Sequence, residues 1–168
     1  MTPTRYFYWC SFTVLVLAMP VAQAHGDNGS TMSNSSVLFI CLISSVFAWS
    51  AGNEWLETNS VIGRPTVFCL GMFSGTVHLL LGLDDLILMV GGIGVIVILG
   101  ASLVPNLKRL KVQLRFGLGS VISVMLIGYF ATNHDLHYIS EDYLGLITKV
   151  AEIGLLQQLV TNVDSLDS

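Results

Sequence analysis

The most informative stretch for the fold of this chain is Gly75-x-x-His78-x-x-x-Gly82-x-Asp84-Asp85-x-x-x-Met89. This polar stripe lies inside the most apolar part of the sequence, and residues 66–104 carry no other charge. An ionisable side chain at the centre of a bilayer costs about 2.5–3.5 kcal/mol on insertion scales. His78, Asp84 and Asp85 therefore either lie at the aqueous edge of an apolar helix or have a function within it.

The composition is that of an integral membrane protein. Of the 168 residues, 53% are hydrophobic and 11% are charged, whereas soluble domains contain about 25% charged residues. The net charge of -4, with only seven Lys and Arg residues, argues against nucleic-acid binding. We expect one membrane domain in contact with the lipid bilayer.

The first 24 residues have the pattern of a secretory signal peptide. Arg5 supplies a positive charge, residues 11–20 form a short apolar segment, and Ala22-Gln23-Ala24 fits the small-x-small cleavage rule. Cleavage would leave a mature chain that begins at His25, with residues 25–36 as an external polar arm. The alternative is an uncleaved first helix.

The long apolar run from residue 66 to residue 104 is too long to cross a membrane once. As one helix its roughly 39 residues would reach about 58 Å, whereas a hydrocarbon core is about 30 Å thick. The segment Gly82-Leu83-Asp84-Asp85 divides the run into two workable spans. We therefore predict that the chain folds back there.

Three further apolar segments complete the predicted fold. They cover residues 37–51, 116–131 and 144–160, with a polar connection at residues 53–65 and a polar tail at residues 161–168. The predicted fold class is all-α: a polytopic transmembrane helical bundle of about five mature spans, occupying residues 37–160, after a cleaved signal peptide.

The distribution of basic residues predicts the orientation. The loop at residues 105–115 holds four of the seven Lys and Arg residues, and such loops are cytoplasmic. With the fold-back, a mature N-terminus outside places this loop inside and the C-terminus in the cytoplasm. We expect an integral protein of the inner or plasma membrane.

This topology gathers histidines and acids on the outer side. His78 lies near Asp84 and Asp85, and His25, His134 and His137 fall in outer segments, where they could collect metal ions. Imidazole and carboxylate ligands together suit divalent transition metals. The candidate metal ligands are therefore His78, Asp84 and Asp85.

Each of these signals also has a purely structural interpretation. His78 could hydrogen-bond to a neighbouring helix, and the two aspartates could cap the helix that follows them. The outer histidines could belong to solvated loops. Gly75 and Gly82 favour close helix packing.

Lys149 and Glu152 are spaced as a mutually neutralised i,i+3 pair. We expect this pair to face other helices or the membrane interface.

The stretch from Gly75 to Met89 resembles the first-helix signature of the HupE/UreJ family of small nickel/cobalt permeases. That signature reads roughly G-x-x-H-P-x-x-G-x-D-H-x-x-x-M. His78 and Asp84 match it, whereas Asp85 stands where the family has a second His and Leu79 where it has Pro. The resemblance implies that His78 and Asp84 take up the metal ion, and Asp85 could supply an oxygen ligand in place of the second His.

The leading hypothesis is a permease for a divalent transition metal, nickel or cobalt, which is not an enzyme and holds no permanently bound cofactor. The alternative is a non-catalytic structural or accessory subunit of a larger membrane complex, because so thin a bundle needs partner subunits or a second copy. A membrane-embedded enzyme or electron carrier that uses His78 as a ligand is a third hypothesis. It is the weakest, since haem or copper sites need more facing ligands than this chain offers.

Overall fold

The computed structural model describes residues 32–59, 62, 64–83, 85–132 and 142–161. These residues form five α-helices, one 3-10 helix and no strand, so the predicted all-α class is confirmed. The elements are α2 (Asn34–Asn59), α3 (Pro65–Leu81), α4 (Leu86–Ser102), η2 (Pro105–Leu110), α5 (Lys111–Thr132) and α7 (Tyr143–Thr161). The predicted signal peptide and most of the external arm and polar tail lie outside the described residues.

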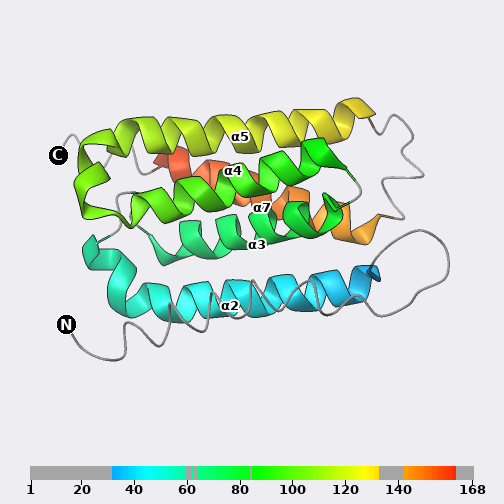
Figure 1. The fold of residues 1–168 in the computed structure, drawn as a ribbon, viewed down its shortest axis with the longest axis horizontal. Coiled ribbons are helices and arrows are strands. Elements are labelled where there is room, and N and C mark those ends of the chain that lie inside the picture. Colours follow the sequence, from blue (N-terminus) through cyan, green and yellow to red (C-terminus); the bar gives the residue numbers. More distant parts are fainter. Residues whose placement is uncertain (1–31, 60–61, 63, 84, 133–141, 162–168) are drawn as a thin grey trace.

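Helix α3 is the centre of the bundle. It packs against α2, α4 and α7, while α5 runs along the bundle and packs against α4 and α7 (Figure 1). Because α3 has neighbours on three sides, every residue from Gly71 to His78 is buried. Any polar side chain in this part of α3 must therefore find its partner inside the bundle.

The predicted fold-back is confirmed at the α3–α4 corner. Pro65 occupies the first turn of α3, where its missing N–H costs nothing. The helix ends at Leu81, and the Gly82 amide donates to the His78 carbonyl oxygen at 2.8 Å. Asp85 then begins α4: its Oδ1 accepts from the amides of Ile87 at 2.9 Å and Leu88 at 3.4 Å.

Two helices extend beyond the apolar spans that the sequence predicts. Helix α2 continues to Asn59, through the first half of the expected polar connection, because Glu54, Leu56 and Glu57 are good helix formers. The basic loop is also shorter than expected. Its second half is the first turn of α5, since no proline or glycine interrupts the sequence from Lys111 to Arg115.

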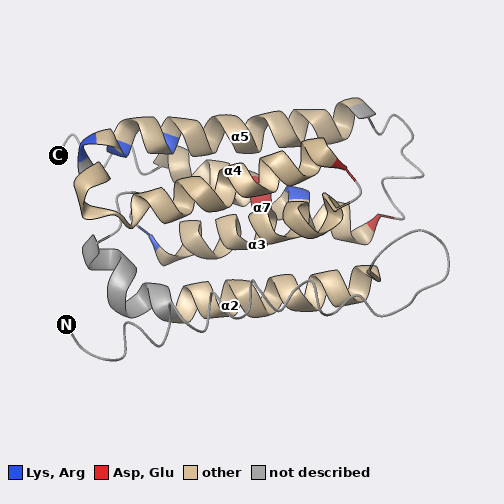
Figure 2. Cartoon of the chain, in the orientation of Figure 1, with Lys and Arg blue, Asp and Glu red and all other residues tan. Residues whose placement is uncertain are grey.

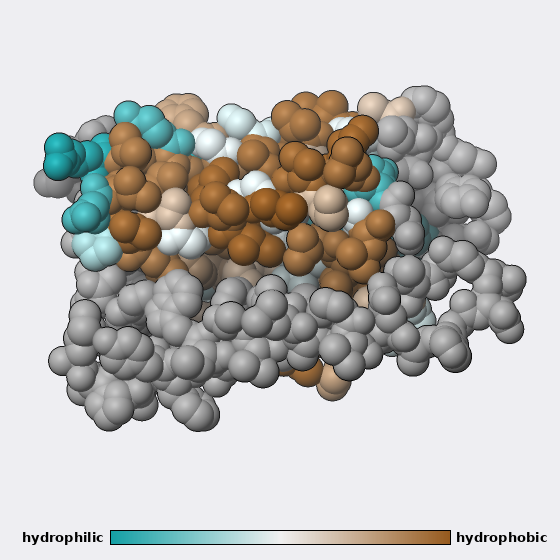
Figure 3. Space-filling view, in the orientation of Figure 1, coloured by the Kyte–Doolittle hydropathy of each residue, from teal (hydrophilic) through white to brown (hydrophobic). Residues whose placement is uncertain are grey.

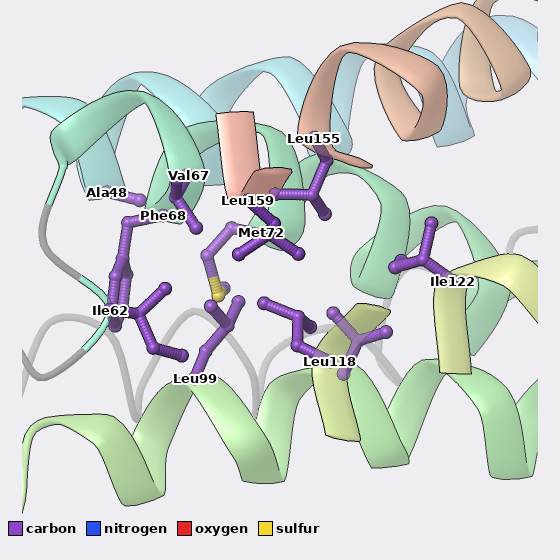
Figure 4. Close-up of a cluster of buried hydrophobic side chains, with 11 residues drawn as sticks. Ala48, Ile62, Val67, Phe68, Met72, Leu99, Leu118, Ile122, Leu155 and Leu159 are labelled. Carbon is purple, nitrogen blue, oxygen red and sulfur yellow. The ribbon is translucent and has the colours of Figure 1, made fainter. Parts of the chain in front are cut away.

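Two apolar clusters hold the helices together. The larger one joins α2, α3, α4, α5 and α7 through side chains such as Met72, Leu99, Leu118 and Leu155 (Figure 4). The smaller one lies where α2, α3 and the start of α7 meet, and includes Val37, Phe73 and Leu144. Both clusters involve α3, which explains why this helix fixes the positions of the others.

The outer surface of the bundle is strongly apolar. Large hydrophobic side chains are exposed on α2, α4, α5 and α7, among them Phe39, Ile87, Val97, Phe116 and Val150. Figure 3 shows this apolar surface over α4 and α5, with hydrophilic side chains towards its ends. Within the described residues, α5 and α7 are long and apolar enough to cross a membrane, and three shorter apolar helices accompany them.

Charged residues gather at the two ends of the bundle. Arg109, Lys111 and Arg115 lie at the end where α5 begins, whereas Asp85 and Asp142 lie at the opposite end (Figure 2). At the basic end, an Arg115 guanidinium nitrogen donates to the Leu159 carbonyl oxygen at 2.5 Å, near the end of α7. A helix C-terminus carries unpaired carbonyl groups and partial negative charge, so this contact is stabilising.

Candidate functional site

A buried polar network joins α3 to α7 in the middle of the bundle. Ser74 and His78 lie one turn apart on α3, and Lys149 and Glu152 lie one turn apart on α7. Residues three or four apart share a helix face, and α3 and α7 pack against each other. The four side chains therefore meet across one helix–helix contact.

Glu152 is the hub of this network. Its Oε1 lies 2.7 Å from His78 Nε2 and accepts from Ser74 Oγ at 2.9 Å. Its Oε2 accepts from Lys149 Nζ at 2.7 Å. The carboxylate is fully buried, and its two oxygens together have three partners.

Because this ion pair is buried, the loss of either partner should strongly destabilise the fold. Lys149 is 3% exposed and Glu152 is 0% exposed. Withdrawing charges from water costs several kcal/mol per ion, and removal of one partner from a buried pair typically costs about 3–5 kcal/mol. The predicted Lys149–Glu152 pair is confirmed, and it faces other helices.

His78 retains one unsatisfied nitrogen. An ionised Glu152 can only accept hydrogen bonds, so a neutral His78 ring donates from Nε2 and carries a lone pair on Nδ1. His78 is only 4% exposed, and its Nδ1 atom is buried without a hydrogen-bond partner within the described residues. Buried polar groups are nearly always paired, and a neutral imidazole nitrogen is the commonest metal ligand in proteins.

A glycine of α4, Gly92, packs against the α3 backbone next to His78. A Cβ atom on Gly92 would lie 2.6 Å from the Leu79 amide nitrogen and 2.8 Å from the Gly75 carbonyl oxygen. Gly75 makes the reciprocal approach, because a Cβ there would meet Ile96 at 3.0 Å. The absence of side chains at these two positions lets α3 and α4 touch through their backbones.

Gly82 is equally constrained at the α3–α4 corner. A Cβ atom there would collide with the Met89 backbone and lie 2.6 Å from the His78 carbonyl oxygen.

A second polar group lies between the network and the acidic end of the bundle. Tyr129 of α5 donates its hydroxyl to Asp142 Oδ2 at 3.1 Å. Asp142 Oδ1 accepts from the Gly145 amide at 2.9 Å, which caps α7. Lys149 Nζ lies 5.1 Å from the centre of the Tyr129 ring, within the range of a cation–π contact.

The structure separates the predicted metal ligands. His78 is bonded to Glu152 in the interior, whereas Asp85 is exposed and its carboxylate is bonded to α4 amides. Asp85 and Met89 belong to α4, so they do not extend a face of α3. Asp84, His25, His134 and His137 lie outside the described residues.

No preassembled metal cluster is present in the described part of the chain, where no three His, Cys, Asp or Glu side chains are grouped to hold an ion. His78 and Glu152 are a hydrogen-bonded pair that could supply two ligands. The sequence identified each of these residues but not their contact, because 74 residues separate them. The available signal was that both are ionisable residues within apolar helices, and such residues almost always face the interior of a bundle.

Comparison with known proteins adds no relative: no protein-family model, no curated protein and no solved structure matches this chain.

Proposed function

We propose that this chain is a polytopic helical membrane protein that carries a divalent transition metal, nickel or cobalt, across the inner or plasma membrane. Its exposed apolar side chains support a bilayer environment. Helices α3 and α4 have 17 residues each, at the lower limit of roughly 17–25 residues for a transmembrane helix. All five described α-helices would then cross the bilayer.

The orientation in this proposal follows from the charged ends of the bundle. Basic residues near membrane-spanning helices are retained in the cytoplasm. The end that holds Arg109, Lys111 and Arg115 would face inward, and the end with Asp85 and Asp142 would face outward. The outward end would then carry negative charge, which attracts cations.

The observation that carries the metal proposal is the 2.7 Å contact between His78 Nε2 and Glu152 Oε1 at the centre of the bundle. A transition metal would replace this hydrogen bond, binding Nε2 and an oxygen of the carboxylate, with the ring proton on Nδ1. Two protein ligands would leave the other coordination positions to water. Transport requires binding that is strong enough to admit the ion and weak enough to release it, so a small ligand set suits this role.

Metal accumulation in cells tests the proposal. Nickel and cobalt content is measured in a host that lacks its own permeases, at matched membrane levels of wild type, His78→Ala and Glu152→Gln. Because Glu152→Gln leaves a buried ammonium unpaired, the charge-balanced double variant Lys149→Met/Glu152→Gln provides a second test of the carboxylate. Thr148→Val is the matched control, since Thr148 is buried beside Lys149 but, among the described residues, its hydroxyl donates to the Leu144 carbonyl oxygen and not to the network.

We expect accumulation to fall at least about tenfold in the His78 and Glu152 variants, because mutating even the outer-shell partners of a metal site typically costs about 10–100-fold, and to persist in Thr148→Val. Uptake that persists in all the His78 and Glu152 variants would exclude this pair as the metal path. Wild type that accumulates no more metal than the empty vector would exclude the permease function.

One observation favours a second function, that of a structural or accessory subunit. The Glu152 carboxylate already has three hydrogen-bond partners within the protein. A buried ion pair whose only role is to orient two helices needs such partners and no metal ion. The apolar face of α4, defined by Ile87, Val90 and Val97, would then dock another membrane subunit. Val97→Trp should release a co-purifying partner without unfolding the bundle, whereas a lone transporter would be unaffected.

A further inference from the structure

Lys149 lies between two acidic groups at different depths in the bundle. Its Nζ donates a hydrogen bond to Glu152 Oε2 at 2.7 Å and lies over the face of the Tyr129 ring, 5.1 Å from the ring centre. The hydroxyl of that ring is bonded to Asp142 at 3.1 Å. A continuous series of polar groups thus leads from the central carboxylate towards the acidic end.

The spacing along α7 places these groups on one face. Asp142 and Lys149 are seven residues apart, close to two full turns, so their side chains project in similar directions. From residue 142 to residue 152 the helix rises about 15 Å, which is half the thickness of a hydrocarbon core of about 30 Å. The series therefore extends from the end of the bundle to its centre.

Gly145 leaves room along this face. It lies one turn before Lys149, and a Cβ atom at this position would collide with Asp142 Oδ2 and lie 2.8 Å from Tyr129 Oη. A glycine here lets the Tyr129–Asp142 pair lie directly against α7, one turn before Lys149. Lysine has a long, flexible stem that can reposition its charge.

A metal ion at His78 and Glu152 would create an excess of buried positive charge if Lys149 stayed in place. One carboxylate cannot neutralise both a divalent ion and an ammonium group, and repulsion between them is strong in a low-dielectric interior. The repulsion is relieved if the ammonium leaves Glu152 and pairs with another anionic group.

We propose that Lys149 is a tethered cation that occupies Glu152 when no metal is bound and moves to the Tyr129–Asp142 pair when a metal ion takes its place. The movement exchanges one ion pair for another, and it breaks no covalent bond and transfers no proton. The Tyr129 ring face stabilises the ammonium along the way. This inference rests on the proposed function, since it describes how the same carboxylate is held ready for the metal.

The mechanism predicts opposite effects of two substitutions on metal affinity. Lys149→Gln removes the competing charge but keeps a hydrogen-bond donor for Glu152, so metal should bind more tightly. Asp142→Asn keeps the cap of α7, because Asn is as good an N-cap as Asp. It removes the charge that receives the ammonium, so metal should bind more weakly.

The test is Ni²⁺ and Co²⁺ binding to the purified full-length protein in detergent, measured by calorimetry for wild type, both single variants and the double variant. We expect a change in Kd of about tenfold in each direction, within the coupling range of contacting residues. In the double variant Lys149→Gln/Asp142→Asn, the Asp142 substitution should have no further effect, since no ammonium needs a second site.

The outcomes distinguish this inference from the proposed function. Wild type that binds metal while both single variants bind it more weakly, or both bind it unchanged, would overturn the tethered-cation role and leave the metal site standing. An Asp142→Asn effect that persists in the double variant would also overturn it. Wild type that binds neither metal would overturn the metal site and this inference together.

Discussion

His78 on α3 and Glu152 on α7 are 74 residues apart in the chain, and their side chains meet at 2.7 Å in the interior of the bundle. Ser74 and Lys149 donate the other two hydrogen bonds to the Glu152 carboxylate. Because all four side chains are buried, the network fixes the register of α3 against α7 as well as providing a candidate cation site. Its structural and chemical roles can be separated by experiment.

Glu152→Gln should destabilise the fold far more than the charge-balanced double variant Lys149→Met/Glu152→Gln. The single change leaves the Lys149 ammonium buried without a counter-ion, at a cost of about 3–5 kcal/mol. The double change removes both charges, and we expect it to recover more than half of that loss. Denaturant unfolding in detergent measures both, and equal destabilisation by the two variants would show that the ion pair contributes little.

Gly92→Ala should weaken the contact between α3 and α4. The added methyl group would meet backbone atoms of Leu79 and Gly75 at 2.6 and 2.8 Å, and backbone cannot move aside as a flexible side chain can. We expect a loss of about 1–3 kcal/mol, typical of overpacking. Gly100→Ala is the matched control on the same helix, because a Cβ there has nothing within 4 Å.

The control should raise stability by up to about 1 kcal/mol, the usual gain when Ala replaces Gly in a helix. Thermal unfolding of both variants checks the prediction. Similar effects of the two substitutions would mean that α3 and α4 do not touch through their backbones at Gly92.

Asp85→Ala and Asp85→Asn should distinguish a helix cap from a metal ligand. Asp85 Oδ1 accepts two α4 amides, so Ala should cost about 1 kcal/mol of stability and Asn should be nearly neutral. Metal uptake by Asp85→Asn should remain at the wild-type level if the residue only caps α4. Uptake lost in a stably folded Asp85→Asn would restore Asp85 to the metal path.

Single cysteines at the two ends of the bundle should report its orientation. Leu83, at the α3–α4 corner, and Leu110, at the basic end, are both exposed. In a background without the native cysteines, a membrane-impermeant maleimide should label Leu83→Cys in intact cells and Leu110→Cys only after permeabilisation. The reverse pattern would invert the proposed topology, and labelling of both in intact cells would argue against a membrane-embedded bundle.

The sequence by itself determined the helices and the place where the chain reverses. The apolar run from residue 66 to residue 104 was too long for one predicted membrane span, and Gly82 with Asp85 marked the break that separates α3 from α4. These are local properties, because a helix end depends on nearby capping groups and backbone preferences. For the same reason the i,i+3 spacing of Lys149 and Glu152 was sufficient to predict their pairing.

Only the tertiary structure decided which residues share a site. Proximity in the sequence suggested that His78 and Asp85 share a site. The packing of α3 against α7 instead places His78 against Glu152, and the Asp85 carboxylate accepts hydrogen bonds from α4 amides. Helix-to-helix contacts depend on which faces pack together, including the backbone approach permitted by Gly92. That information is spread over the whole bundle, so no local pattern near His78 contains it.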